Sequence, residues 1–218
     1  MVDEIDGKRL RAVLFDLGGV VLGSPLHAIA AYEEEAGVEA GAFNRMVVAN
    51  GTAGAWHRLE RGELALGADF YDALDDELTR ADLPLRAREL MARVGAAGEV
   101  RQEMLLAIDR LRAADFLVAA LTNNWKREGA DDGALSPELR QRFHHVVESQ
   151  RVGLRKPDPR IYELACRLVG VEPVEVVFLD DIGSNLKSAR ALGMTTIKVE
   201  DPREALRELE RVVGIALL

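Results

Sequence analysis

Short apolar runs alternate along the chain with longer stretches whose apolar residues recur at helical spacing. A short apolar run bounded by turn or polar residues indicates a buried strand. We expect strands at Arg11–Leu17, Phe116–Leu121, Val146–Glu148, Val176–Leu179 and Thr195–Val199. We expect helices at Val100–Ala114, Asp158–Val169, Ser184–Leu192 and Pro202–Val213. Because strands and helices alternate and the strands are almost continuously apolar, the pattern predicts an α/β fold: a Rossmann-like parallel sheet with helices on both faces.

The segment after the first expected strand breaks this alternation. From Pro25 to about Gly98 the sequence shows only amphipathic helical stretches, such as Leu26–Ala36, Ala42–Val48 and Leu64–Leu83. An all-helical insertion of this length resembles a separate small bundle more than a crossover. We therefore expect a Rossmann-like core of residues 1–22 and 99–218 and an inserted helical cap of residues 23–98. The alternative is a decoration with no role in the functional site.

The composition narrows the class of protein. Of 218 residues, 48% are hydrophobic and 30% are charged, which is typical of a globular protein and too apolar for disorder. A formal net charge of −9 argues against nucleic acid or an anionic membrane as a partner. The single cysteine, Cys166, excludes a disulfide framework and fits a small buried apolar residue. Since neither a signal peptide nor a spanning apolar run is visible, we expect a cytoplasmic protein.

Polar side chains follow the expected strands at their carboxyl ends. These residues are Asp16 after the first strand, Thr122 after the second, Lys156 in the loop after the third, and Asp180 and Asp181 after the fourth. In open parallel sheets, ligands bind outside the carboxyl ends of the strands. We therefore expect three carboxylates, a hydroxyl and an ammonium group at one edge of the sheet.

Three clustered carboxylates predict a divalent cation. They repel one another, and without compensation at least one would be protonated at neutral pH. Oxygen ligands without histidine or thiolate favour Mg²⁺ over zinc, and Mg²⁺ shares its coordination with waters and substrate phosphate oxygens. Lys156 can neutralise a phosphoryl oxygen, while Thr122 and the backbone of Asn123 can donate hydrogen bonds to the same group. The set predicts phosphoryl transfer from a small phosphorylated substrate.

The motifs that carry these residues resemble those of a known family. FDLGGVVL, LTNN, the lysine of GLRKPDPRIY and FLDDIGSNLKSARALGM resemble, in order, the four motifs of the haloacid dehalogenase-like hydrolase superfamily. The likeness covers essentially the whole chain, including the inserted helices. More narrowly, KPDPRIY, VVFLDDIGSNLK and ELERVVGIALL are similar to the N-terminal phosphatase domain of soluble epoxide hydrolase. They are also similar to the module fused to some acyl-CoA dehydrogenase-family proteins.

The resemblance implies a role for each matching residue. Asp16 would be the nucleophile that takes the phosphoryl group, and Lys156 would neutralise charge beside it. Mg²⁺ would be bound by the Asp16 carboxylate, the Gly18 carbonyl and the Asp181 carboxylate, with Asp180 behind them or linked through water. The phosphoryl oxygens would be held by Thr122, Asn123 and Lys156. Three residues of the cap are candidates to contact the substrate: Trp56, Arg58 and Arg61. A purely structural role is at least as well supported for them.

Gly18 departs from the phosphatase pattern. Most phosphatases of the superfamily carry a second aspartate two residues after the nucleophile, which protonates the leaving group and later activates water. The backbone carbonyl is retained here, but the proton donor is lost. General acid–base catalysis is worth about 10²–10⁴-fold, or roughly 3–5 kcal/mol of barrier. We expect alkyl phosphates to lose the most and acyl, aryl or anomeric sugar phosphates the least.

Three functions stay open at this point. The first is a phosphohydrolase that is slow on alkyl phosphates or that takes a proton donor from the cap or the substrate. The second is a module that binds a phosphorylated ligand or a partner without turnover. The third is a dehalogenase-type hydrolase, which needs no acid because halide leaves unprotonated. The paired carboxylates Asp180 and Asp181 favour a metal and weigh against the third.

Overall fold

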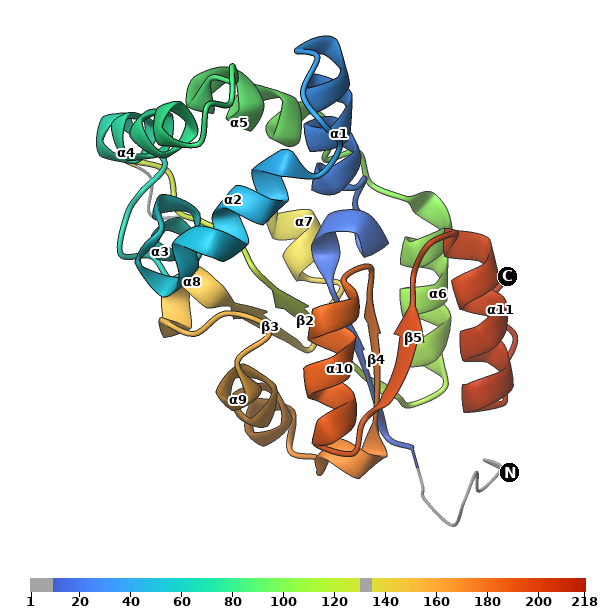
Figure 1. The fold of residues 1–218 in the computed structure, drawn as a ribbon. Coiled ribbons are helices and arrows are strands. Elements are labelled where there is room, and N and C mark those ends of the chain that lie inside the picture. Colours follow the sequence, from blue (N-terminus) through green and yellow to red (C-terminus); the bar gives the residue numbers. More distant parts are fainter. Residues whose placement is uncertain (1–9, 130–134) are drawn as a thin grey trace.

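A five-stranded parallel sheet forms the centre of the protein (Figure 1). The structure is a computed structural model and describes residues 10–129 and 135–218. The strands are β1 (Ala12–Phe15), β2 (Leu117–Thr122), β3 (His145–Glu148), β4 (Val176–Asp180) and β5 (Thr195–Lys198), in the order β3-β2-β1-β4-β5. All four neighbouring pairs are parallel. The predicted fold class is confirmed, and each predicted strand end lies within two residues of the observed one.

Both faces of the sheet are buried, and the strand sequences explain how. Successive side chains of a strand point to opposite faces. In β1, Val13 and Phe15 pack into one apolar cluster, whereas Ala12 and Leu14 pack into the other. The first cluster includes α6 (Gln102–Ala113) and α11 (Pro202–Val213), and the second includes α9 (Pro159–Val169) and α10 (Gly183–Ala191). A strand covered on both sides needs apolar residues at every position, which produces the continuous runs in the sequence.

A layer of helices lies over the carboxyl ends of the strands and has its own apolar cluster (Figure 1). Its members are α1 (Pro25–Glu35), α2 (Ala42–Asn50), α3 (Ala55–Glu60), α4 (Ala68–Arg80) and α5 (Ala87–Ala96). Two of them, α3 and α5, lie within the segment predicted to be helical but outside the three stretches named there. The six residues of α3 are too few to show a period. The buried positions of α5 do follow helical spacing, at Ala87, Leu90, Met91 and Val94, so its pattern was overlooked.

Shorter elements complete the described chain. They are a π-helical turn at Leu17–Val21, 3₁₀ turns at Gly51–Ala53 and Pro173–Glu175, α7 (Pro137–Arg140) and α8 (Ser149–Val152). Cys166 is buried within α9, as its composition-based interpretation predicted. None of the helices within the described ranges has the length and apolar character that crossing a bilayer requires. Part of the N-terminal stretch used in the signal-peptide argument, residues 1–9, lies outside those ranges.

Two isolated β-bridges help to attach the helical layer to the rest of the described chain. The two connecting segments run side by side: Leu22 and Val100 form an antiparallel bridge, and Arg101 N donates to the Val21 carbonyl at 2.9 Å. Far from these connections, Leu66 forms a parallel bridge with Arg127, which follows β2. The layer is therefore held over the strand ends from both sides.

Candidate active site

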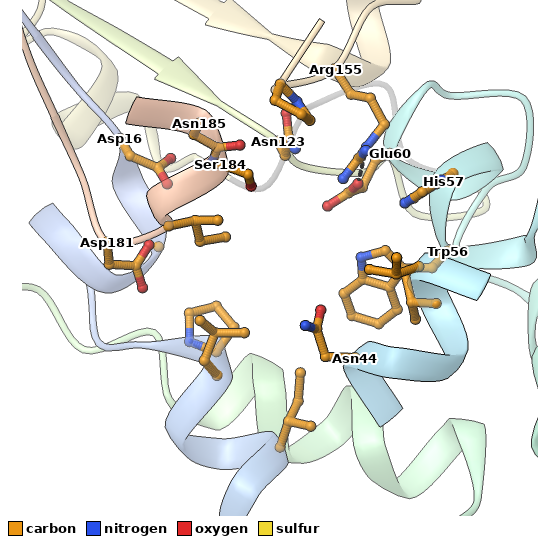
Figure 2. Close-up of a pocket in the computed structure, with 18 of the residues that line it drawn as sticks. Asp16, Asn44, Trp56, His57, Glu60, Asn123, Arg155, Asp181, Ser184 and Asn185 are labelled. Atoms are coloured by element: carbon orange, nitrogen blue, oxygen red, sulfur yellow. Dashed lines mark hydrogen bonds and ion pairs between the residues drawn. The ribbon is translucent and has the colours of Figure 1, made fainter. Parts of the chain in front are cut away.

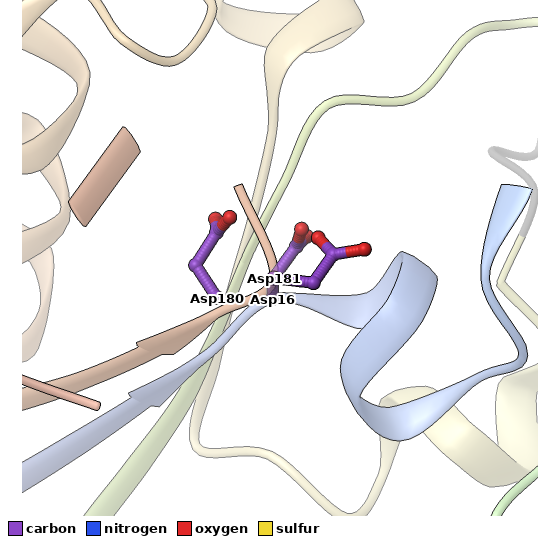
Figure 3. Close-up of side chains that lie close together, drawn as sticks. All are labelled: Asp16, Asp180 and Asp181. Carbon is purple, nitrogen blue, oxygen red and sulfur yellow. The ribbon is translucent and has the colours of Figure 1, made fainter. Parts of the chain in front are cut away.

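The carboxylates at the strand ends lie close together. Asp16 follows β1. Asp180 is the last residue of β4, the strand next to β1 in the sheet, and Asp181 follows it (Figure 3). One oxygen from each lies within 4.8 Å of the others. Lys156 Nζ, from the loop after β3, lies 2.9 Å from Asp16 Oδ1 and 2.7 Å from Asp180 Oδ2. Three separate segments thus bring three carboxylates and one ammonium group to one sheet edge.

The two adjacent aspartates have different surroundings. Asp180 is fully buried, and its Oδ1 accepts hydrogen bonds from Ile182 N at 2.7 Å and Asn185 Nδ2 at 3.1 Å. Its Oδ2 accepts from Lys156 Nζ. Asp181 instead faces a cavity, where its Oδ2 accepts a bond of 3.3 Å from Ser24 Oγ. Asp180 therefore braces Lys156, while Asp181 presents oxygen to the cavity.

Gly19 makes the approach of Asp181 possible. The turn after β1 gives Gly19 a φ of 79°, which non-glycine residues rarely adopt. A Cβ built at this position would lie 2.0 Å from Asp181 Oδ2. The turn also directs the Leu17 amide at Asp16 Oδ1, at 2.7 Å. Lys156 contacts the same Oδ1. The other oxygen of Asp16, Oδ2, therefore remains without a hydrogen bond or ion pair to the described part of the chain.

The site holds an excess of negative charge. Burial raises the pKa of Asp16 to about 8; nearby Lys156 opposes this, and Asp180 and Asp181 add to it. Burial and the Asp180 charge also raise the pKa of Asp181. Burial favours neutral Lys156, but Asp16 and Asp180 together raise its pKa. One ammonium group against three carboxylates leaves a deficit that a divalent cation would remove. The available ligands, Asp16, Asp181 and the Gly18 carbonyl, are hard oxygens of the kind that Mg²⁺ accepts.

The residues after β2 are arranged around Lys156. The Asn123 side chain accepts a hydrogen bond from Lys156 N at 2.8 Å and donates one to the Lys156 carbonyl at 3.1 Å. It therefore holds the backbone on both sides of the Lys156 Cα. Thr122 is buried at the end of β2, where its hydroxyl lies 3.5 Å from the Asn123 carbonyl. Asn123 is one of the residues that line the cavity. Thr122, Lys156 and Asp180 are buried and are not among its described lining residues.

A cavity of about 440 Å³ separates the strand ends from α1, α2 and α3 (Figure 2). Asp16, Gly18 and Asp181 line one end. Most of the remaining wall is apolar and consists of Pro25, Leu26, Ile29, Phe43, Val47, Val48, Trp56, Trp125, Pro157 and Ile182. Of the cap candidates named from the sequence, Trp56 lines the cavity. Arg58 and Arg61 instead pair with Glu63 and are not among the described lining residues.

One ion pair interrupts the apolar wall opposite the carboxylates. Arg155 Nε lies 2.5 Å from Glu60 Oε2, which joins α3 to the loop that carries Lys156 (Figure 2). Burial raises the pKa of Glu60, and Arg155 opposes that shift. Burial also lowers the pKa of the neighbouring His57, and the Arg155 charge adds to the effect. The sequence pattern does not indicate this pair, nor the roles of Ser24 and Asn185. The one available clue was the position of Arg155 next to Lys156.

Comparison with known proteins places this geometry in a family. The model of the haloacid dehalogenase-like hydrolases matches residues 10–193. The chain belongs to this hydrolase family. It is 34% identical over 213 residues to acyl-CoA dehydrogenase family member 10 of Mus musculus, covering 97% of this chain and 20% of that protein. It is 37% identical over 220 residues to bifunctional epoxide hydrolase 2 of Sus scrofa, covering 96% of this chain and 40% of that protein.

The chain therefore spans less than half the length of each of these two relatives. Among solved structures, a haloacid dehalogenase family enzyme of Bacteroides thetaiotaomicron, in complex with magnesium and inorganic phosphate, has a TM-score of 0.59. It is 21% identical and covers 88% of this chain and 96% of its own. At this identity the match supports the shared fold. The resemblance inferred from the four sequence motifs is confirmed by the family match.

Proposed function

We propose that this hydrolase is a Mg²⁺-dependent phosphatase that acts on a small phosphorylated metabolite with Asp16 as the nucleophile. The observation that carries the proposal is the uncompensated charge at the strand ends. Asp16 and Asp181 both present oxygen to the cavity, and the one ammonium group that the described residues bring to these three carboxylates, Lys156, pairs with Asp16 and Asp180. A cation together with a phosphoryl group would complete such a site.

The donor set supports Mg²⁺ held by Asp16, the Gly18 carbonyl and Asp181. Asp180 would stay behind them, since its oxygens already accept bonds from Lys156, Ile182 and Asn185. A bound ion would neutralise the phosphoryl oxygens and polarise the phosphorus for attack.

The side chains then have distinct tasks in the proposed reaction. Asp16 Oδ2 attacks phosphorus, because Oδ1 is held by Leu17 N and Lys156. Lys156 opposes protonation of that carboxylate, as the bound cation would, and offsets charge on the phosphoryl group. Thr122 and the Asn123 amide would hold the phosphoryl oxygens, while the Asn123 side chain positions Lys156.

The proposal also assigns the two parts of the chain. The core of residues 1–22 and 99–218 would supply the chemistry, and the helical cap of residues 23–98 would select the substrate. Three observations support this division: the helical layer has a separate apolar cluster, the connecting segments meet at Leu22 and Val100, and the cavity lies between the two parts. The apolar wall fits the organic portion of a substrate better than a second charged group.

Hydrolysis of an aryl phosphate tests the proposal. We expect Mg²⁺-dependent turnover by the purified protein and its loss in Asp16→Asn. A matched control is Asp115→Asn, an exposed aspartate at a φ of 63°, a conformation that asparagine also tolerates. Phosphate binding without turnover of any phosphate ester would instead support the binding module. Halide release from a 2-haloacid in the presence of chelator would support the dehalogenase.

A further inference from the structure

The cavity contains a nucleophile but is poor in groups that can give up a proton. Among the described residues, its titratable lining side chains are Asp16, His57, Glu60, Arg155 and Asp181. Under the proposed function Asp16 is the nucleophile and Asp181 holds the cation. Arginine stays protonated in proteins and does not serve as an acid. The remaining candidates are therefore Glu60 and His57.

Neither candidate is arranged as a donor. The Glu60 carboxylate lies 2.5 Å from Arg155 Nε and also accepts a bond from Trp56, so it acts as a hydrogen-bond acceptor. Burial and the Arg155 charge favour neutral His57, and its Nδ1 is buried without a partner in the described chain. Both residues also lie across the cavity from Asp16 (Figure 2). Among the described residues that line the cavity, none is thus placed beside Asp16 as a proton donor, and Lys156, which lies beneath the lining, is held by its ion pairs with Asp16 and Asp180.

The place where a donor could stand is filled by a proline ring. Gly18 lines the cavity two residues after Asp16 and has an ordinary φ of −64°. A Cβ at Gly18 would lie 3.1 Å from Pro25 Cγ and 3.2 Å from Pro25 Cδ. Pro25 is the first residue of α1, and its ring lines the same wall. A side chain at position 18 would therefore meet the Pro25 ring at once, and the ring would have to shift by a few tenths of an ångström to make room.

We infer that Pro25 and Gly18 together restrict the enzyme to phosphates whose leaving group departs as a stable anion, that is, acyl and aryl phosphates. This inference rests on the proposed phosphatase function and names its substrate class. Pro25 is then a specificity-determining residue, since it keeps the space beside the nucleophile apolar.

The chemistry balances without an acid for such substrates. Asp16 Oδ2 forms a bond to phosphorus while the bond from phosphorus to the leaving oxygen breaks. The electron pair stays on that oxygen, which leaves as a carboxylate or phenolate. Water then attacks phosphorus, the bond to Asp16 breaks, and the products are the free carboxylate and dihydrogen phosphate, which carries both protons of the water. An alkoxide cannot leave in this way because it is far too basic at neutral pH.

The first test is a substrate series: substituted phenyl phosphates, acetyl phosphate and butyl phosphate. The quantity to compare is kcat/KM, which reports the first chemical step, because hydrolysis of the aspartyl phosphate is common to all substrates. We expect kcat/KM to fall steeply as the leaving group becomes more basic, with butyl phosphate about 10²-fold or more below phenyl phosphates. A shallow dependence with active butyl phosphate would overturn the inference and leave the phosphatase function standing. Inactivity on every phosphate would instead overturn the function itself.

The second test restores a donor. Gly18→Asp combined with Pro25→Ala should raise the ratio of butyl to phenyl phosphate hydrolysis by about 10²-fold. Gly18→Asp alone should gain much less, because the Pro25 ring crowds the new side chain. Gly18→Asn with Pro25→Ala is the matched control: it has the same shape but no acidic proton, and it should show no gain in the ratio. Equal ratios in the Asp and Asn variants would overturn the inference.

A third variant checks the strongest competing donor. Glu60→Gln keeps the size of the side chain and removes its titration. If Glu60 gives no proton, the substitution changes kcat/KM for phenyl and butyl phosphates by the same factor. A selective loss on butyl phosphate would identify Glu60 as the missing acid and overturn the inference.

Discussion

The two ends of the cavity differ in polarity and in how their side chains are held. At the strand ends, hydrogen bonds and ion pairs fix the charged side chains, including fully buried Asp180 and nearly fully buried Lys156. At the helical end the wall is mostly apolar, and its rim exposes Leu26 by 40% and Val48 by 67%. Substitutions at the first end should therefore damage chemistry and stability, and those at the second should alter substrate choice.

Removal of Lys156 is expected to have the largest effect. Lys156→Met leaves the buried carboxylates of Asp16 and Asp180 without their ammonium partner, and loss of one partner of a buried pair costs about 3–5 kcal/mol. The loss of charge stabilisation should also lower kcat by about 10²–10³-fold. Urea denaturation without Mg²⁺ and steady-state kinetics with Mg²⁺ measure the two effects. Lys187→Met, an exposed lysine on α10, is the control and should change stability by less than about 0.5 kcal/mol. Equal urea midpoints for both variants would contradict the buried-pair argument.

Gly19→Ala should have the next largest effect, concentrated on the cation. The left-handed conformation costs an L-residue about 1–2 kcal/mol, and the new Cβ would displace the Asp181 carboxylate. We expect Mg²⁺ affinity, measured by isothermal titration calorimetry, to fall by about 10-fold or more, the scale seen when metal-ligand positioning is lost. Gly214→Ala shares the positive φ, at 72°, but its Cβ meets no atom within 4 Å. It should lose only stability. Unchanged Mg²⁺ affinity in Gly19→Ala would exclude Asp181 as a ligand.

These two predictions show what the sequence could reveal and what it could not. The strand ends that bear Asp16, Thr122 and the Asp180–Asp181 pair were predictable, because parallel strands bring their carboxyl ends to one edge. The different tasks of Asp180 and Asp181 were implied by the family resemblance alone, because adjacent aspartates are chemically identical until the backbone turns them to different partners. The sequence could not show that Glu60 pairs with Arg155, 95 positions away. Such contacts depend on how the helical layer sits on the sheet, which no local pattern records.

Val47 tests the apolar end with a smaller effect. Val47→Thr conserves shape but places a hydroxyl in the cavity wall, at a cost of roughly 1–3 kcal/mol where the hydroxyl finds no partner. Val94→Thr places the same change in the same apolar cluster, away from the described cavity lining. Both variants should lose similar stability in thermal denaturation. KM for an apolar aryl phosphate should rise several-fold in Val47→Thr alone. An equal KM in both variants would show that substrate does not contact this wall.

The smallest effect on KM is expected for a substitution at the rim of the cavity. A rim residue can contact substrate without contributing much to stability, so its substitution tests substrate contact by itself. Val48 is 67% exposed, so Val48→Ser should change the free energy of unfolding by less than about 0.5 kcal/mol. If the organic portion of the substrate covers about 20 Å² of this side chain, its loss costs about 0.5 kcal/mol and raises KM about 2-fold. The rise should grow with the apolar length of the substrate. Leu106→Ser, a 58% exposed position on α6, should leave KM unchanged at every length. A KM for Val48→Ser that does not vary with substrate length would place the organic portion elsewhere in the cavity.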